Sequence, residues 1–245
     1  MKIVIINGIN HKGQTYTLTH KLVDKINGSV QEFFLPKDFN EFCLGCATCI
    51  FKGESNCPHY EKIKPLVDAL IEADLIVLSS PVYCMHATGS MIAFLDHLGY
   101  MWMAHRPNET MFKKQAVVVT TCAGAGKKST LKDMNDSLFY LGVPKVYKLG
   151  VALMAPTLDE MKDKKKKKVE KKTFKLAKKI EKKNGKVKPK FKTKAFFFLM
   201  HLMQKNGYNE IDKNYWNERK WTKKSRPWKN KWVWYILSNF FYGII

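Results

Sequence analysis

The sequence lacks any uninterrupted run of eighteen apolar residues, which is about the length that a membrane-spanning helix needs. Its first residues, MKIVIING, are too short for a secretion signal, so we expect a cytoplasmic chain that starts to fold at Met1. We do not expect global disorder, because 45% of the residues are hydrophobic and can form a core. Six cysteines without an export signal are typical of thiols or metal ligands and not of disulfides.

Acidic residues are scarce only in the last third of the sequence. Residues 1–160 carry 16 Lys and Arg against 15 Asp and Glu, whereas residues 161–245 carry 27 against 6. The formal net charge of +22 is therefore a property of the C-terminal part. We expect one domain over residues 1–183 and a basic, aromatic-rich helical extension over residues 184–245.

Five apolar runs of strand length alternate with five segments of helical periodicity. The expected strands are 2–7, 30–35, 74–80, 115–121 and 144–153, and the expected helices are 15–26, 60–72, 90–99, 129–141 and a lysine-rich segment over 161–183. This alternation predicts an α/β fold, because right-handed crossovers place helices over both faces of a parallel sheet. A doubly wound five-stranded sheet binds its ligand at the carboxyl ends of the strands.

The loop after the first strand, NGINHKGQTYTL at residues 7–18, has the features of an anion site. A Gly-containing turn into a helix aims unpaired backbone N–H groups at one point, and the helix dipole favours negative charge there. Lys12 adds a positive charge, and Thr15 and Thr17 add hydroxyl donors. The alternative is an ordinary turn with a Thr cap. A Rossmann fingerprint is excluded, because the loop contains no G-x-G-x-x-G.

This loop resembles the phosphate loop of the flavodoxin-like NAD(P)H-dependent FMN reductases, whose G-S-x-x-x-G-x-T segment binds the FMN phosphate. Gly13 and Thr15 match that pattern, and Asn10 stands in place of the usual Ser. The resemblance covers residues 1–155. It implies that the phosphate is held by Asn10, Lys12, Gly13, Gln14 and Thr15.

The third strand ends in SSPVYCMHATGSM, residues 79–91. This segment resembles the S-P-x-Y-x-x-x-x-(T/S)-G motif of the same reductases, with Ile92 where they often have Lys. The resemblance implies a flat backbone wall against the flavin ring, made by Pro81, Val82, Tyr83 and Cys84. The alternative is a strand that simply stops at a proline. Cys84 beside the ring is either a redox thiol or, as we prefer, a small packing residue, and Cys122 is interpreted the same way.

The loop after the fourth strand, TTCAGAGKK at residues 120–128, is rich in small residues. We expect it to lie against the edge of the flavin ring through Thr121 and Gly124. It is not a Walker loop, because the first glycine of that motif is absent. His86 and His97 have no metal-ligand spacing and are assigned no role.

Four cysteines form the pattern C-x2-C-x2-C-x7-C: Cys43, Cys46, Cys49 and Cys57. Thiolates with this spacing on a tight loop can converge on a cubane cluster. The motif resembles that of the iron–sulfur flavoproteins of the same family, which implies a [4Fe–4S] cluster near the FMN. Zinc also accepts four thiolates, and free or redox-active thiols are a third alternative.

The C-terminal extension contains two segments that combine aromatic and aliphatic residues, Phe196–Met203 and Trp232–Ile245. Lys and Trp flank them, as in segments that lie at a membrane interface. Packing against the core or a sister subunit, peripheral membrane contact and nucleic-acid binding are the alternatives, and nucleic acid is the least favoured because no recognised module occurs. Residues 214–228 resemble the Trp-rich segment of extended clostridial-type members of the family.

The resemblance implies an FMN-dependent oxidoreductase that takes hydride from NADH or NADPH. It would pass electrons to a quinone, an electron-poor aromatic compound or an iron–sulfur acceptor, and it would work as a homo-oligomer. We name no catalytic side chain. Two other functions stay open: an iron–sulfur flavoprotein that transfers electrons between proteins, and a membrane- or nucleic-acid-binding protein whose flavodoxin-like domain has lost its flavin.

Overall fold

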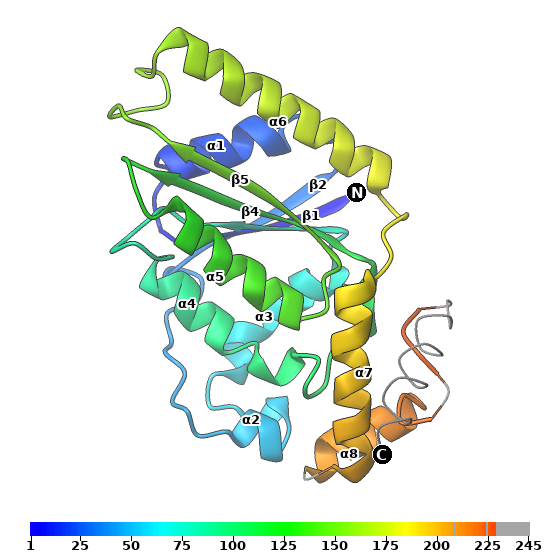
Figure 1. Ribbon diagram of the computed structural model, residues 1–245. Coiled ribbons are helices and arrows are strands. Elements are labelled where there is room, and N and C mark those ends of the chain that lie inside the picture. Colours follow the sequence, from blue (N-terminus) through cyan, green and yellow to red (C-terminus); the bar gives the residue numbers. More distant parts are fainter. Residues whose placement is uncertain (208, 224, 229–245) are drawn as a thin grey trace.

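The computed structural model describes residues 1–207, 209–223 and 225–228. Its centre is a single five-stranded sheet of order β2-β1-β3-β4-β5, in which every neighbouring pair is parallel (Figure 1). The strands are β1 (Lys2–Asn7), β2 (Ser29–Phe34), β3 (Leu75–Ser79), β4 (Gln115–Cys122) and β5 (Lys145–Ala152). This sheet confirms the predicted flavodoxin-like fold class. Strands β3 and β4 are buried at every residue, which is why their sequences are continuous apolar runs.

Helices cover both faces of the sheet (Figure 1). Helices α1 (Gln14–Val23) and α6 (Asp163–Lys183) pack on one face, and α3 (Tyr60–Glu72), α4 (Gly89–Asp96) and α5 (Lys127–Tyr140) pack on the other. Each face has its own apolar cluster. The lysine-rich α6 belongs to the first cluster, because it buries Val169, Ala177 and Ile180 and turns its lysines outward.

Short helices occupy the connections. They are α2 (Thr48–Phe51) and the 3-10 turns η1 (Glu54–Asn56), η2 (Gly99–Met101) and η3 (Glu109–Lys113). Helix α2 and turn η1 lie inside the cysteine motif, where sequence periodicity gave no signal. We call residues 41–57, which carry this motif, the cysteine loop.

The described part of the C-terminal extension contains two helices, α7 (Phe191–Asn206) and α8 (Glu210–Glu218). They close a third apolar cluster in which the Phe197 ring stacks on Trp216, with ring centroids 4.8 Å apart, and meets the Phe112 ring of the core in a T-shaped, edge-to-face contact. Phe197 and Phe198 are completely buried. The segment Phe196–Met203 therefore packs one face against the core, as the first of the alternatives above proposed, while Leu199 and Met203 stay exposed on its other side. The second segment, Trp232–Ile245, lies outside the described residues.

Across the described residues, the helices are all too short or too polar to traverse a bilayer.

Candidate functional site

The loop between β1 and α1 leaves backbone donors open at the carboxyl end of the sheet. The residue that caps α1 is Gly13, and no side chain accepts a hydrogen bond from the first turn of the helix. The first-turn N–H groups of a helix have no partner within the helix itself. The alternative of a Thr-capped turn is therefore wrong, and the open amides suit an anion. Asn10 and Lys12 are exposed beside them, and Lys12 Nζ lies 5.5 Å from the centre of the Tyr16 ring.

Two residues predicted to contact the phosphate direct their side chains to other parts of the protein. Thr15 is buried, and its hydroxyl lies 2.5 Å from the hydroxyl of Thr121 at the end of β4. Gln14 Oε1 accepts a hydrogen bond of 2.8 Å from Leu158 N, in the loop after β5. The side chains of Thr15 and Gln14 therefore hold the predicted phosphate loop against β4 and the loop after β5, and the contacts these residues can offer an anion are those of their backbone N–H groups.

The segment after β3 forms a tight turn at the same edge. Tyr83 and His86 exchange backbone hydrogen bonds of 3.0 and 2.9 Å, and the two residues between them have positive φ angles, 47° at Cys84 and 71° at Met85. Such a turn normally takes Asn or Gly, because a left-handed conformation costs other residues energy. Strain of this kind is typical of functional sites. The turn leaves Tyr83 and Met85 about half exposed.

This turn is anchored to the rest of the edge. Val82 N donates to Thr121 O at 3.0 Å, so the segment that starts at Pro81 continues the pairing of β3 with β4. A Cβ atom on Gly126, whose φ is +81°, would lie 2.3 Å from Val82 Cγ1, which shows how closely the loop after β4 approaches the turn. Cys84 is exposed, so its interpretation as a small packing residue is wrong, whereas Cys122 is buried as that interpretation required.

His86 joins the turn to helix α5. Its Nδ1 lies 3.1 Å from Ser129 Oγ and 3.3 Å from Asp133 Oδ2, and that carboxylate also accepts from Ala87 N at 3.2 Å. Sequence reasoning assigned His86 no role. No signal could have found this contact, because its partners lie 43 and 47 residues away without a recognisable spacing.

The three predicted loops thus meet at one edge, at the carboxyl ends of β1, β3 and β4. Gly124 is exposed in the third loop, close to Met154, whose side chain is 77% exposed. The edge combines uncapped amides and a lysine with an exposed apolar and aromatic surface. The amides and the lysine suit a phosphate group, and the apolar and aromatic surface suits a flat ring. FMN carries both.

The four cysteines of the motif lie near one another. Burial raises the pKa of the Cys49 thiol, and the neighbouring thiolates of the other three cysteines raise it further. At Cys46 the effect is opposite, because the Thr48 side chain donates a hydrogen bond that lowers the thiol pKa. No three His, Cys, Asp or Glu side chains in the described part of the chain are placed to hold a metal ion. This conformation presents four thiols and gives the predicted [4Fe–4S] cluster no support.

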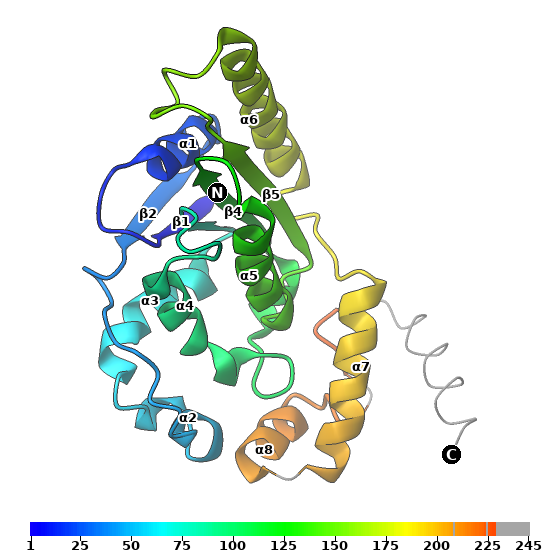
Figure 2. The ribbon, with the colours of Figure 1, turned by 60° about the vertical axis from the view of Figure 1, so that its left-hand side comes forward.

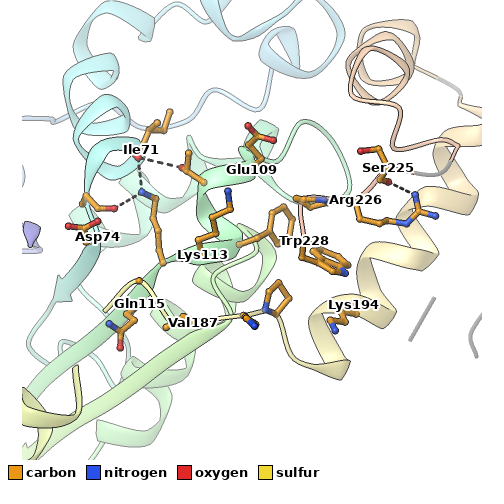
Figure 3. Close-up of a pocket in the computed structure, with 18 of the residues that line it drawn as sticks. Ile71, Asp74, Glu109, Lys113, Gln115, Val187, Lys194, Ser225, Arg226 and Trp228 are labelled. Carbon is orange, nitrogen blue, oxygen red and sulfur yellow. Dashed lines mark hydrogen bonds between the residues drawn. The ribbon is translucent and has the colours of Figure 1, made fainter. Parts of the chain in front are cut away.

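A cavity of about 2020 Å³ lies at the opposite edge of the sheet, where β4 begins (Figure 3). The end of α3, the start of β4 and the C-terminal extension line it. Lys114 in its wall is buried, which lowers the lysine pKa to about 8, and its ammonium donates to the carbonyls of Ile71 and Ala73 at the end of α3. This cavity is separate from the edge that gathers the predicted cofactor residues.

Comparison with known proteins identifies relatives of the N-terminal part. The model of a family described as NADPH-dependent FMN reductase matches residues 1–156. An iron–sulfur flavoprotein from Archaeoglobus fulgidus is 33% identical over 115 residues, which are 46% of this chain and 50% of that protein. An NADPH azoreductase from Bacillus sp. strain OY1-2 is 26% identical over 141 residues, 56% of this chain and 68% of that protein. The chain spans about half the length of its Archaeoglobus fulgidus relatives.

Solved structures share the fold. An FMN-dependent NADH-azoreductase from Bacillus anthracis in complex with FMN superposes with a TM-score of 0.56 at 11% identity, covering 74% of this chain and all of that one. At this identity the likeness concerns the fold alone. The family match ends at residue 156 and so leaves out the C-terminal extension, whose architecture has to be understood from the chain itself.

Proposed function

The chain belongs to the NADPH-dependent FMN reductase family, and we propose that it binds FMN at the carboxyl edge of its sheet and oxidises a reduced nicotinamide through it. The observation that carries the proposal is the convergence of three loops, at residues 10–15, 81–86 and 121–124, on that one edge. Each follows a different strand, and the all-parallel order of the sheet brings the three strand ends together.

In the proposed site, the first turn of α1 binds the phosphate group of FMN. The open first-turn amides after Gly13 would donate to the phosphate oxygens, and the positive end of the helix dipole favours the same charge. Lys12, exposed in the loop, would add a full positive charge. The hydroxyl pair of Thr15 and Thr121 would keep this loop at a fixed distance from the end of β4.

In the proposed site, the turn at residues 81–86 contacts the flavin ring. Pro81 and Val82 are held to β4, and the left-handed pair at Cys84 and Met85 turns the exposed Tyr83 surface outward. Bound FMN would supply the redox chemistry by accepting hydride from NADH or NADPH and passing electrons on. The protein's contribution is to hold the phosphate, to present a flat wall to the ring and to exclude water from one face.

The proposed acceptor is a small electron-poor molecule, a quinone or an azo or nitroaromatic compound. One relative is named an NADPH azoreductase, which is consistent with this class. The predicted homo-oligomer is part of the same proposal, and the mass of the protein in solution tests it. Turnover of NADPH with a quinone and with an azo dye, measured side by side, tests the acceptor class.

The test of the proposed function is anaerobic reduction of the flavin bound to the full chain. After rapid mixing, NADPH or NADH should bleach the absorbance of the bound, oxidised FMN. NADP⁺ added in place of NADPH, and free FMN at the same concentration in place of the protein, serve as controls. Protein that binds no FMN, or bound FMN that neither nicotinamide reduces, would contradict the proposal. The same oxygen-free sample is assayed for iron and acid-labile sulfide, of which a cubane cluster would contribute about four each per chain.

A further inference from the structure

The cysteine loop is held by polar contacts and not by an apolar core. No residue between positions 41 and 57 is buried, and three of its large apolar residues are mostly exposed: Phe42 is 70% exposed, Leu44 67% and Phe51 55%. Burial of apolar surface, the usual stabilising force, therefore contributes little here. The hydrogen bonds that reach the loop from outside must define its conformation.

Arg106 supplies the central contacts. Its side chain is only 5% exposed, and its guanidinium donates to the carbonyl oxygens of Cys49 and Ile50, in the second case at 3.2 Å. Both carbonyls belong to α2, inside the cysteine motif. Glu54, also in the loop, lies 3.4 Å from the same guanidinium. A planar guanidinium with five donors suits this bridging position better than any other side chain.

The C-terminal extension completes the arrangement, with α8 lying beside α2 (Figure 2). Asp212 of α8 is fully buried; it forms an ion pair with Arg106, and its other oxygen lies 2.7 Å from His105 Nδ1. Asn209, at the start of α8, donates to Ile50 O at 2.9 Å and to Asp212 at 3.0 Å. Residues more than 150 positions apart therefore share one buried polar network.

We propose that Asp212 and Asn209 are positioning residues that, together with Arg106, hold the cysteine loop in place, so that docking of α8 controls the access of reagents to its two half-buried thiols, Cys49 and Cys57. A buried carboxylate is stable only when it is paired, so α8 docks where Arg106 is available. When α8 leaves, Arg106 loses a buried counter-ion and Ile50 loses a donor. Undocking of the extension and opening of the loop are thus one coupled event. This inference does not depend on flavin binding.

Alkylation of the full-length, reduced chain by iodoacetamide, followed residue by residue with peptide mass spectrometry, tests the proposal. Asn209→Ser keeps a side chain that can cap α8, which Asn209 now does through Ile211 N, but it removes the amide that reaches Ile50. Asp212→Ala removes the ion pair. Loss of such contacts should raise the alkylation rate of the half-buried Cys49 and Cys57 about tenfold.

Matched controls lie in the same chain. Glu218→Ala removes one acidic side chain from α8 that is 74% exposed and does not reach the loop, and it should leave Cys49 unchanged. Cys84 is exposed outside the loop, and Cys122 is buried in the core, so their rates report general reactivity and global unfolding. A pH series separates loop opening from electrostatics, because opening raises the rate even at the pH where the thiol is fully ionised.

Increased rates at Cys49 and Cys57 alone, in both variants, would support the proposal. An Asp212→Ala variant that alkylates Cys49 no faster than Glu218→Ala would overturn it, as would an increase that vanishes at full ionisation. If Asp212→Ala also exposes Cys122, that variant has unfolded globally and Asn209→Ser decides. An unchanged rate at Cys49 in Asn209→Ser then overturns the proposal.

Discussion

The hydroxyl groups of Thr15 and Thr121 lie 2.5 Å apart, although 106 residues separate them in the sequence. Thr15 is in the first turn of α1, Thr121 is near the end of β4, and both are buried. Their hydrogen bond joins the predicted phosphate loop to the predicted ring-edge loop. Because Thr121 O also accepts from Val82 N, all three loops of the candidate site are linked through Thr121.

The losses of unfolding free energy on removing these two hydroxyl groups should be strongly non-additive. Thr15→Val or Thr121→Val alone leaves a buried hydroxyl without its partner, which costs about 1–3 kcal/mol of unfolding free energy. The double variant removes both polar groups and should cost less than the sum of the single ones. Denaturant unfolding of the four proteins measures this difference. Additive losses would show that the two hydroxyls do not depend on each other.

The strained turn at Cys84 predicts which substitutions at this position the protein tolerates. Its φ of 47° is tolerated by Asn, whereas a β-branched residue is costly there. Cys84→Asn should therefore keep both stability and FMN affinity, while Cys84→Val should lose about 1–2 kcal/mol of unfolding free energy. Thermal unfolding with and without FMN compares the two. Equal stability of the Val and Asn variants would mean that the turn does not adopt the left-handed conformation.

Trp216 should be as important to stability as a residue of the main core. It is fully buried and stacks on Phe197, so Trp216→Ala is expected to cost about 3–5 kcal/mol. Phe191→Ala is the matched control, because Phe191 is aromatic, belongs to the same extension and is 62% exposed; it should change stability by no more than about 0.5 kcal/mol. Similar losses in the two variants would contradict the packing of the extension described here.

The extension should also make stability depend on pH. Burial lowers the pKa of His201 to about 4, from an ordinary value of 6.5, and its Nδ1 lies 2.7 Å from Trp221 O. Between these two pH values the unfolded chain binds a proton that the folded chain does not, so stability falls as the pH decreases from 6.5 towards 4. His201→Asn, which keeps an N–H donor but does not titrate, should flatten this slope in denaturant unfolding series. A slope that is unchanged in His201→Asn would contradict this account.

The sequence predicted the central fold because the strands and helices of the core follow simple periodicities. Helix α3 has the bounds that its apolar spacing indicated, and the buried β3 and β4 read as continuous apolar runs. The three loops of the candidate site were found because each directly follows a strand. Parallel strands bring their carboxyl ends together whatever the details of packing.

The extension and the cysteine loop were harder to predict because distant residues define them. Asp212 occurs in a polar stretch that reads as exposed, yet it is fully buried because Arg106 pairs with it. Phe197 occurs in a segment that resembles a membrane-interface helix, and it is buried because Trp216, Trp221 and Phe112 surround its ring. Neither partner set has a local signature in the sequence.

The affinity of the full chain for FMN, compared between wild type, Lys12→Ala and Lys2→Ala, tests the central claim most directly. Lys12 lies at the carboxyl end of β1, whereas Lys2 begins the same strand at the other edge and pairs with Glu72. Loss of a charged contact to the phosphate should weaken binding about 10- to 100-fold in Lys12→Ala and leave Lys2→Ala at the wild-type value. No saturable binding of one FMN per chain, or equal affinity in all three proteins, would contradict a flavin site at this edge.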